Sequence, residues 1–164
     1  MLSPLVAATT AHTVFDVLVV AHVVCAVLGF GALMLTGVYG FAYRRPDAAG
    51  MEEARRYFGG QGRLELLVLV VPFLGAAALL VQPRGPGLGQ LWDLLAAGVW
   101  LVAAVVLFAV VRPAERRLRD ALAVADGEGE WPVVATNATR LGWAGLGTDL
   151  AFVVALLLMI FQPR

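Results

Sequence analysis

Four long apolar segments constrain the fold of this chain most, because each is long enough for a helix to cross a lipid bilayer. We expect them at Val14 to Tyr43, Leu64 to Val81, Leu91 to Val111 and Leu141 to Phe161. Of the 164 residues, 60% are hydrophobic and 15% are charged, which is too apolar a balance for an ordinary soluble domain. The sequence therefore predicts one all-α domain over residues 1–164, an integral membrane bundle of four antiparallel helices.

Beyond Arg112 we expect the third helix to continue out of the membrane into the cytoplasm. Pro113 falls where interfacial water can satisfy the carbonyl that a proline leaves without its hydrogen bond. Glu115 and Arg119 have the i,i+4 spacing of a helical ion pair. The acidic run Asp126 to Glu130 contains two glycines and predicts the turn that ends this extension.

The distribution of arginine predicts the orientation. All twelve basic residues are arginines, and ten of them fall in the first and third loops. They are Arg44, Arg45, Arg55, Arg56 and Arg63, followed by Arg112, Arg116, Arg117, Arg119 and Arg140. Because basic loops remain inside, both termini are expected outside, in a multi-pass protein of the bacterial plasma membrane (cell inner membrane). The stretch Met1 to Thr13 lacks the basic start and cleavage site of a signal peptide, so we expect the first helix to be retained.

Charge and small residues limit the partners. The formal net charge is zero, so nucleic acid is not an expected partner, whereas the lipid bilayer is. Small residues recur at Ala21–Cys25–Gly29 and Ala32–Thr36–Gly40 in the first segment. Such rows let helix backbones approach closely, within one chain, in a homodimer or against other membrane subunits.

His22 is the first candidate site residue, because ionisable groups inside a membrane span are costly. It lies about 10 Å below the outer end of its helix at 1.5 Å per residue. Gly75, Gly98 and Val154–Ala155 lie at the same depth, so little side-chain volume surrounds the imidazole. Either His22 hydrogen-bonds across a close helix interface, or the space holds a haem or a metal ion that His22 coordinates. Cys25, at i+3, would add a sulfur of the kind that copper accepts.

Asp149 is the second candidate, near the middle of the fourth segment. A lone carboxylate there is costly, so a neutral, hydrogen-bonded carboxyl is the expected resting form. Depth matching predicts Thr36 and the Val68 carbonyl, which Pro72 leaves without its helical hydrogen bond, as partners. This arrangement is either a hydrogen bond that fixes helix register or the proton site of a small transporter.

Further ligands are few. His12, in the outer tail, could fold back as a second imidazole or meet a second subunit, and Met159 is the soft ligand nearest the outer layer. There is no phosphate-binding glycine loop and no triad arrangement on one side of the membrane. The sequence therefore assigns no catalytic residues.

Three stretches carry a resemblance to a known family. They are the first-helix run from Ala21 to Gly31, the third-helix exit from Val111 to Leu118 and the ending from Leu158 to Pro163. They resemble a family of integral membrane proteins catalogued only as a domain of unknown function, distantly similar to the copper-resistance protein D group. The resemblance implies that His22 ligates haem b, as in related four-helix proteins of haem biosynthesis, or lies on a path for copper.

These observations favour a non-enzymatic accessory or assembly factor that binds haem or copper at His22. The alternative is a small proton- or cation-coupled transporter that uses Asp149. A haem-dependent membrane oxidoreductase is a second alternative, for which one chain offers few ligands and no second redox group.

Overall fold

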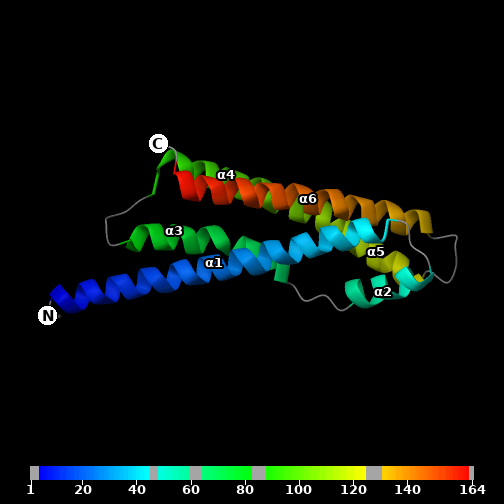
Figure 1. Ribbon diagram of the computed structural model, residues 1–164, viewed down its shortest axis with the longest axis horizontal. Coiled ribbons are helices and arrows are strands. Elements are labelled where there is room, and N and C mark those ends of the chain that lie inside the picture. The colour runs from blue at the N-terminus through cyan, green and yellow to red at the C-terminus, as the bar shows by residue number, and fades with distance from the viewer. Residues whose placement is uncertain (1–3, 45–47, 60–63, 83–87, 125–130, 163–164) are drawn as a thin grey trace.

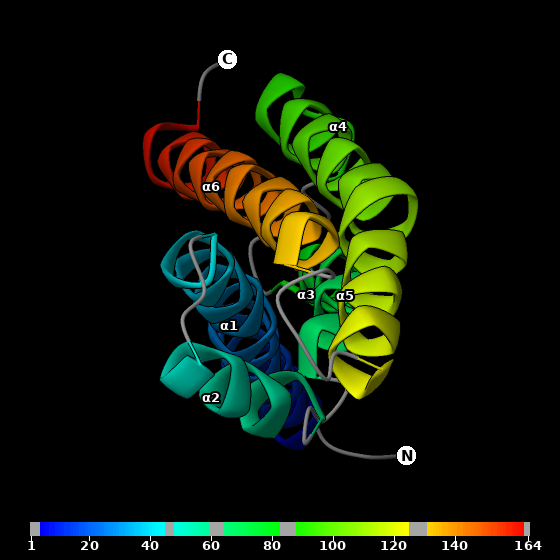
Figure 2. The ribbon, with the colours of Figure 1, turned by 90° about the vertical axis from the view of Figure 1, so that its right-hand side faces the viewer.

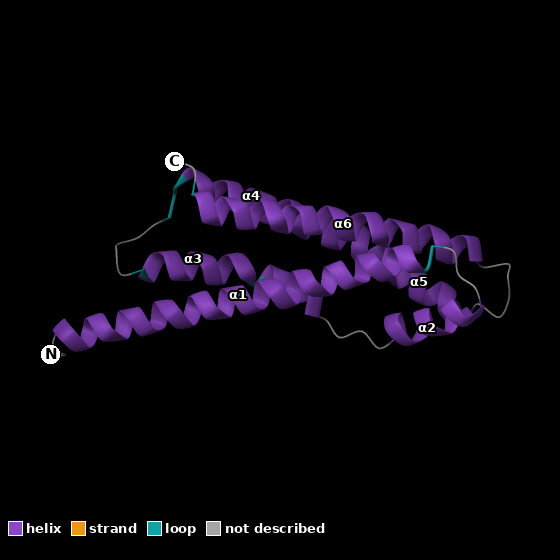
Figure 3. Cartoon of the chain, viewed as in Figure 1, coloured by secondary structure: helices purple, strands orange, loops and turns teal. Residues whose placement is uncertain are grey.

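The computed structural model describes residues 4–44, 48–59, 64–82, 88–124 and 131–162, and all regular structure in these ranges is helical (Figure 3). In chain order the elements are α1 (Pro4–Ala42), α2 (Ala48–Gly59), the 3-10 helix η1 (Leu64–Leu69), α3 (Val71–Val81), α4 (Leu91–Val106), the π-helical turn η2 (Leu107–Val111), α5 (Arg112–Val124) and α6 (Trp131–Phe161). The predicted acidic turn from Asp126 to Glu130 lies outside the described residues.

Four helical stretches are long and apolar enough to cross a membrane, as predicted. They are His12–Ala42, Leu64–Val81, Leu91–Val124 and Trp131–Phe161. The predicted start of the fourth helix at Leu141 is wrong, because α6 begins at Trp131 with Pro132 in its first turn. Proline is favoured in a first helical turn. The polar residues from Thr136 to Arg140 lower the hydropathy of the first turns of α6, so hydropathy alone placed the start of the helix too late.

Prolines shape the second and third long helices in different ways. Pro72 lies in the first turn of α3, directly after η1, so the second span is a 3-10 helix followed by an α-helix. Before Pro113 the chain forms the π-turn η2, in which the Arg112 amide donates to the Leu107 carbonyl. The widened turn adapts the helix to the proline, and the third helix continues through α5 as expected.

The four long helices run side by side, with both termini at one end of the molecule and α2 and α5 at the other (Figure 1). Helix α1 packs against η1 and α3 on one side and against α6 on the other, while α4 packs against α6. Among the described residues, α3 forms no comparable interface with α4 or α6. The end-on view places α1 with α2 below α4 and α6 (Figure 2).

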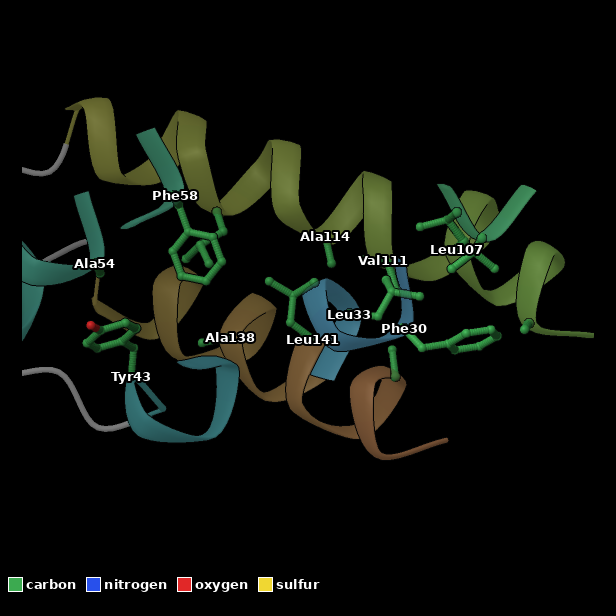
Figure 4. Packing of buried hydrophobic residues seen from close by; sticks show 14 of the residues in the cluster. Phe30, Leu33, Tyr43, Ala54, Phe58, Leu107, Val111, Ala114, Ala138 and Leu141 are labelled. Carbon is green, nitrogen blue, oxygen red and sulfur yellow. The ribbon is translucent and has the colours of Figure 1, made fainter. Parts of the chain in front are cut away.

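The buried core lies toward the α2–α5 end. Buried side chains begin at Ala26 on α1 and at Ala103 on α4, and they end at Thr148 on α6. Figure 4 shows part of this core, from Phe58 near one end to Phe30 near the other. Toward the termini, the described side chains of α1, α4 and α6 are all at least partly exposed in the isolated chain.

Glycines allow the closest helix contact, between α1 and α6. A Cβ on Gly145 would lie 2.4 Å from the Cα of Gly37, and a Cβ on Gly40 would lie 2.6 Å from the Gly142 amide nitrogen. In the other predicted small-residue row, a Cβ on Gly29 would lie 2.7 Å from the Val68 nitrogen in η1. The two rows therefore mark two different interfaces of one helix.

Helix α2, which the sequence analysis left as loop, docks on the end of α1 through aromatic rings. The ring centroids of Tyr39 and Tyr57 are 3.8 Å apart, and Phe58 is fully buried. Burial and the neighbouring Glu53 carboxylate, which accepts a hydrogen bond, raise the pKa of Tyr43 to about 12. The Tyr43 hydroxyl therefore stays protonated at physiological pH and can donate its hydrogen bond to Glu53.

Replacing Gly145 with alanine tests the α1–α6 contact. The new Cβ would meet backbone atoms that cannot rotate away, so we expect Gly145→Ala to lower the free energy of unfolding by about 1–3 kcal/mol. Gly147→Ala is the matched control, because a Cβ on Gly147 meets nothing within 4 Å. Unfolding in mixed micelles, followed by circular dichroism, measures both, and equal midpoints would contradict the packing described here.

Candidate functional site

Where η1 meets α3, two carbonyl groups accept hydrogen bonds from other helices. Pro72 has no N–H, so it cannot bond the carbonyl of Val68 four residues earlier. The Trp100 indole Nε1 on α4 donates to the Val68 carbonyl over 2.8 Å. The His22 Nδ1 on α1 lies 2.8 Å from the Val71 carbonyl. Two helices thus hold the bend through hydrogen bonds from partly buried rings.

The contact with Val71 selects the tautomer of the neutral His22 ring. A carbonyl oxygen only accepts, so Nδ1 carries the proton and, in the neutral ring, Nε2 keeps its lone pair. Nε2 has no hydrogen-bond partner among the described residues. Nε2 is not fully buried, so it is accessible at the surface of the isolated chain. The bond to Val71 therefore orients the ring and leaves its other nitrogen accessible.

Small residues surround His22 on one side only. A Cβ on Gly75 would lie 3.1 Å from the imidazole Cε1 and 3.2 Å from Nδ1, so the ring packs directly against this glycine, as depth matching predicted. A Cβ on Gly98 would meet nothing within 4 Å, and Val154 is exposed. Helices α4 and α6 therefore do not close around His22, which differs from the predicted layer.

Asp149 does not join the predicted cluster with Thr36 and the Val68 carbonyl. It forms no hydrogen bond or ion pair with a described residue, and Trp100 donates to the Val68 carbonyl instead. Its neighbour Thr148 is the residue that α6 turns inward, at 1% exposure, with its hydroxyl bonded to the Ala144 and Gly145 carbonyls. Consecutive helical residues point about 100° apart, so Asp149 lies at the edge of the interface.

The other predicted ligands do not converge on His22. His12 is part of α1, ten positions from His22, so the expected folding back of the tail is wrong and the two lie about 15 Å apart along the helix. Cys25 is a free, partly buried thiol beside the core, and Met159 is partly exposed on α6. In the described part of the chain no three His, Cys, Asp or Glu residues group as a metal site.

Sequence reasoning missed two polar contacts. One is Trp100, whose indole N–H needs a partner in an apolar segment and could have been matched to the Val68 carbonyl. The other is an ion pair between the buried Glu65 and the partly exposed Arg112, with 3.5 Å between nitrogen and oxygen, which joins η1 to α5. The predicted pair of Glu115 and Arg119 does form, at 3.8 Å.

The described residues form an all-helical structure with four helices that can cross a membrane. On the first of these helices, a histidine side chain bonds a backbone carbonyl of the second. No family model, curated protein or solved structure matches this chain.

Trp100→Phe tests the bond to the Val68 carbonyl. The phenyl ring fills much of the space but cannot donate, so the carbonyl loses its partner and stability should fall by about 1–3 kcal/mol. Trp92→Phe is the control, because the Trp92 indole donates only to the exposed Gln90 side chain, over 3.3 Å. Micellar unfolding midpoints compare the two variants, and the same small effect in both would contradict this role.

Proposed function

We propose that the chain is a multi-pass protein of the bacterial plasma membrane, with both termini outside and α2 and α5 inside. The four apolar helices support the membrane location, and the arginines of the α2–α5 end support the orientation. The ion pair of Glu65 with Arg112 then lies near the inner boundary, where two charged groups can reach water.

Within this membrane protein we propose a non-enzymatic accessory role in which His22 binds haem b through Nε2. The observation that carries this proposal is the Nδ1 bond to the Val71 carbonyl together with the accessible Nε2. Histidines that ligate metals usually donate their other ring N–H to a carbonyl or carboxylate, which fixes the tautomer and makes the ligating nitrogen more basic.

The available donors fit haem better than copper. A protein copper site needs several ligands, and near His22 the described residues offer only the Cys25 sulfur, one helical turn away. The porphyrin brings four nitrogens of its own, so a single axial imidazole is enough. The apolar side chains of α1, α4 and α6 that stay exposed toward the termini offer a surface for the macrocycle.

Haem titration of the detergent-purified protein tests this proposal. Wild type should develop a stoichiometric Soret band of an imidazole-ligated haem, and His22→Ala should lose it. His12→Ala should behave as wild type, because His12 lies elsewhere on α1.

His22→Gly with added imidazole separates ligation from folding. Soluble imidazole should restore the band if the variant keeps its helical circular dichroism. An unchanged Soret band in His22→Ala would exclude His22 as the ligand.

Asp149 supports a second candidate function, proton- or cation-coupled transport. It is a partly buried carboxyl without a described hydrogen-bond partner in an apolar helix, and such groups often mark ion paths. Asp149→Asn should reduce proton flux into liposomes to the level without protein. Asp16→Asn is the control, since Asp16 is exposed on α1. Unchanged flux in Asp149→Asn would dismiss this function.

A further inference from the structure

An exposed tryptophan lies beside the close contact between α1 and α6. Trp143 on α6 is 64% exposed, and its ring meets the Phe41 ring on α1 edge to face, with 5.6 Å between the ring centroids. Phe41 in turn lies over Gly142, where an added Cβ would be 2.7 Å from the ring. Trp143 is therefore held against α1 while most of its surface stays exposed.

Two arginines lie within one helical turn of these rings. Arg44 follows Phe41 by three residues, just past the end of α1, and Arg140 precedes Trp143 by three residues on α6. Both are exposed, and neither forms an ion pair or a hydrogen bond with a described residue. The Trp143 indole N–H likewise has no acceptor in the described part of the chain. The donor groups of three side chains are thus available around the Phe41–Trp143 contact.

The glycine contact places the two arginines at similar depths. A Cβ on Gly40 would lie 2.6 Å from the Gly142 nitrogen, so these two glycines share one level of the bundle. Arg44 lies four residues after Gly40, and Arg140 lies two residues before Gly142 on the antiparallel helix, toward the same end. At 1.5 Å per residue the arginines are about 6 Å and about 3 Å beyond the glycines. Long side chains that start at nearly one level can converge on one ligand.

We propose that these residues bind the headgroup of an anionic lipid, with the guanidinium groups of Arg44 and Arg140 on its phosphate and the Trp143 indole beside its glycerol region. A guanidinium carries five N–H donors in a planar fork that matches phosphate. Helices α1 and α6 contain one acidic residue each, Asp16 and Asp149, and both lie more than two helical turns from the arginines. No carboxylate of these two helices therefore competes with the phosphate.

The apolar surface next to this site favours a lipid over a phosphate dissolved in water, and this step rests on the proposed membrane location and orientation. Leu146 and Leu150, three and seven residues after Trp143, continue its exposed face away from the arginines. Acyl chains can cover this face while the headgroup stays with the arginines at the inner boundary. Tryptophan suits the level between them, because its ring is apolar and its N–H is polar.

Thermal unfolding of the full chain in detergent tests the site. Phosphatidylglycerol should raise the melting temperature of wild type more than phosphatidylcholine does, because the phosphatidylcholine headgroup carries no net charge. Arg44→Gln and Arg140→Gln should each lose most of this difference, and their affinity for phosphatidylglycerol in native mass spectrometry should fall by about tenfold. Without lipid both variants should melt as wild type does, because neither arginine has a described partner to lose.

Arg117→Gln is the matched control. Arg117 is exposed on α5 and has no described partner, so this variant removes the same charge away from the α1–α6 contact. It should keep the full effect of phosphatidylglycerol. The proposal is overturned if Arg44→Gln and Arg140→Gln keep that effect, or if Arg117→Gln loses as much of it as they do.

Glycerol phosphate in solution tests whether the ligand must be a lipid. It should stabilise wild type far less than phosphatidylglycerol, because it has no acyl chains for the apolar face. Equal stabilisation by the two would overturn the assignment to lipid. None of these measurements involves a Soret band or a particular orientation in a bilayer, so failure of the proposed function and failure of this site can be told apart.

Discussion

The need to satisfy every backbone carbonyl in an apolar environment explains how the helices meet. Pro72 gives the second span a bend and leaves the Val68 carbonyl without its helical donor. Val68 is fully buried, so water cannot reach its carbonyl and another side chain must supply the hydrogen bond. Trp100 does so from α4, and His22 on α1 adds a hydrogen bond to the nearby Val71 carbonyl at the start of α3. The bend is thus the point where three of the four long helices are joined by polar contacts.

Helix α6 is held by another means, the close approach of glycine backbones. In a membrane, association of helices gains little from the hydrophobic effect, so it depends on tight packing and on hydrogen bonds. The Gly37–Gly145 contact brings α1 and α6 together, and buried core residues lie on both sides of it along α1, from Ala26 to Tyr43. Toward the termini the close glycine contacts between α1 and α6 do not continue, and there the side chains of α4 and α6 are at least partly exposed.

The sequence predicted what hydropathy and proline positions determine: four long apolar helices, the extension through Pro113 and the loss of the helical hydrogen bond to the Val68 carbonyl at Pro72. It did not predict the docking of α2, because that helix packs through an aromatic contact with α1 and hydrogen bonds with α5, and both join residues that are far apart in sequence or separated by a loop. The partners of Asp149 were misjudged for a related reason. Depth fixes position along a helix, but the rotation of α6, which buries Thr148, depends on glycines that are far apart in sequence.

The bond from His22 to Val71 is compatible with the proposed second role of this histidine. A bond at Nδ1 restrains the ring and leaves Nε2 as the nitrogen that the proposed haem would use. Gly75 packs against the ring on one side, and α4 and α6 leave the space near Gly98 open. The proposed haem would therefore approach His22 at the edge of the buried core, which begins at Ala26 on α1 and includes Val71.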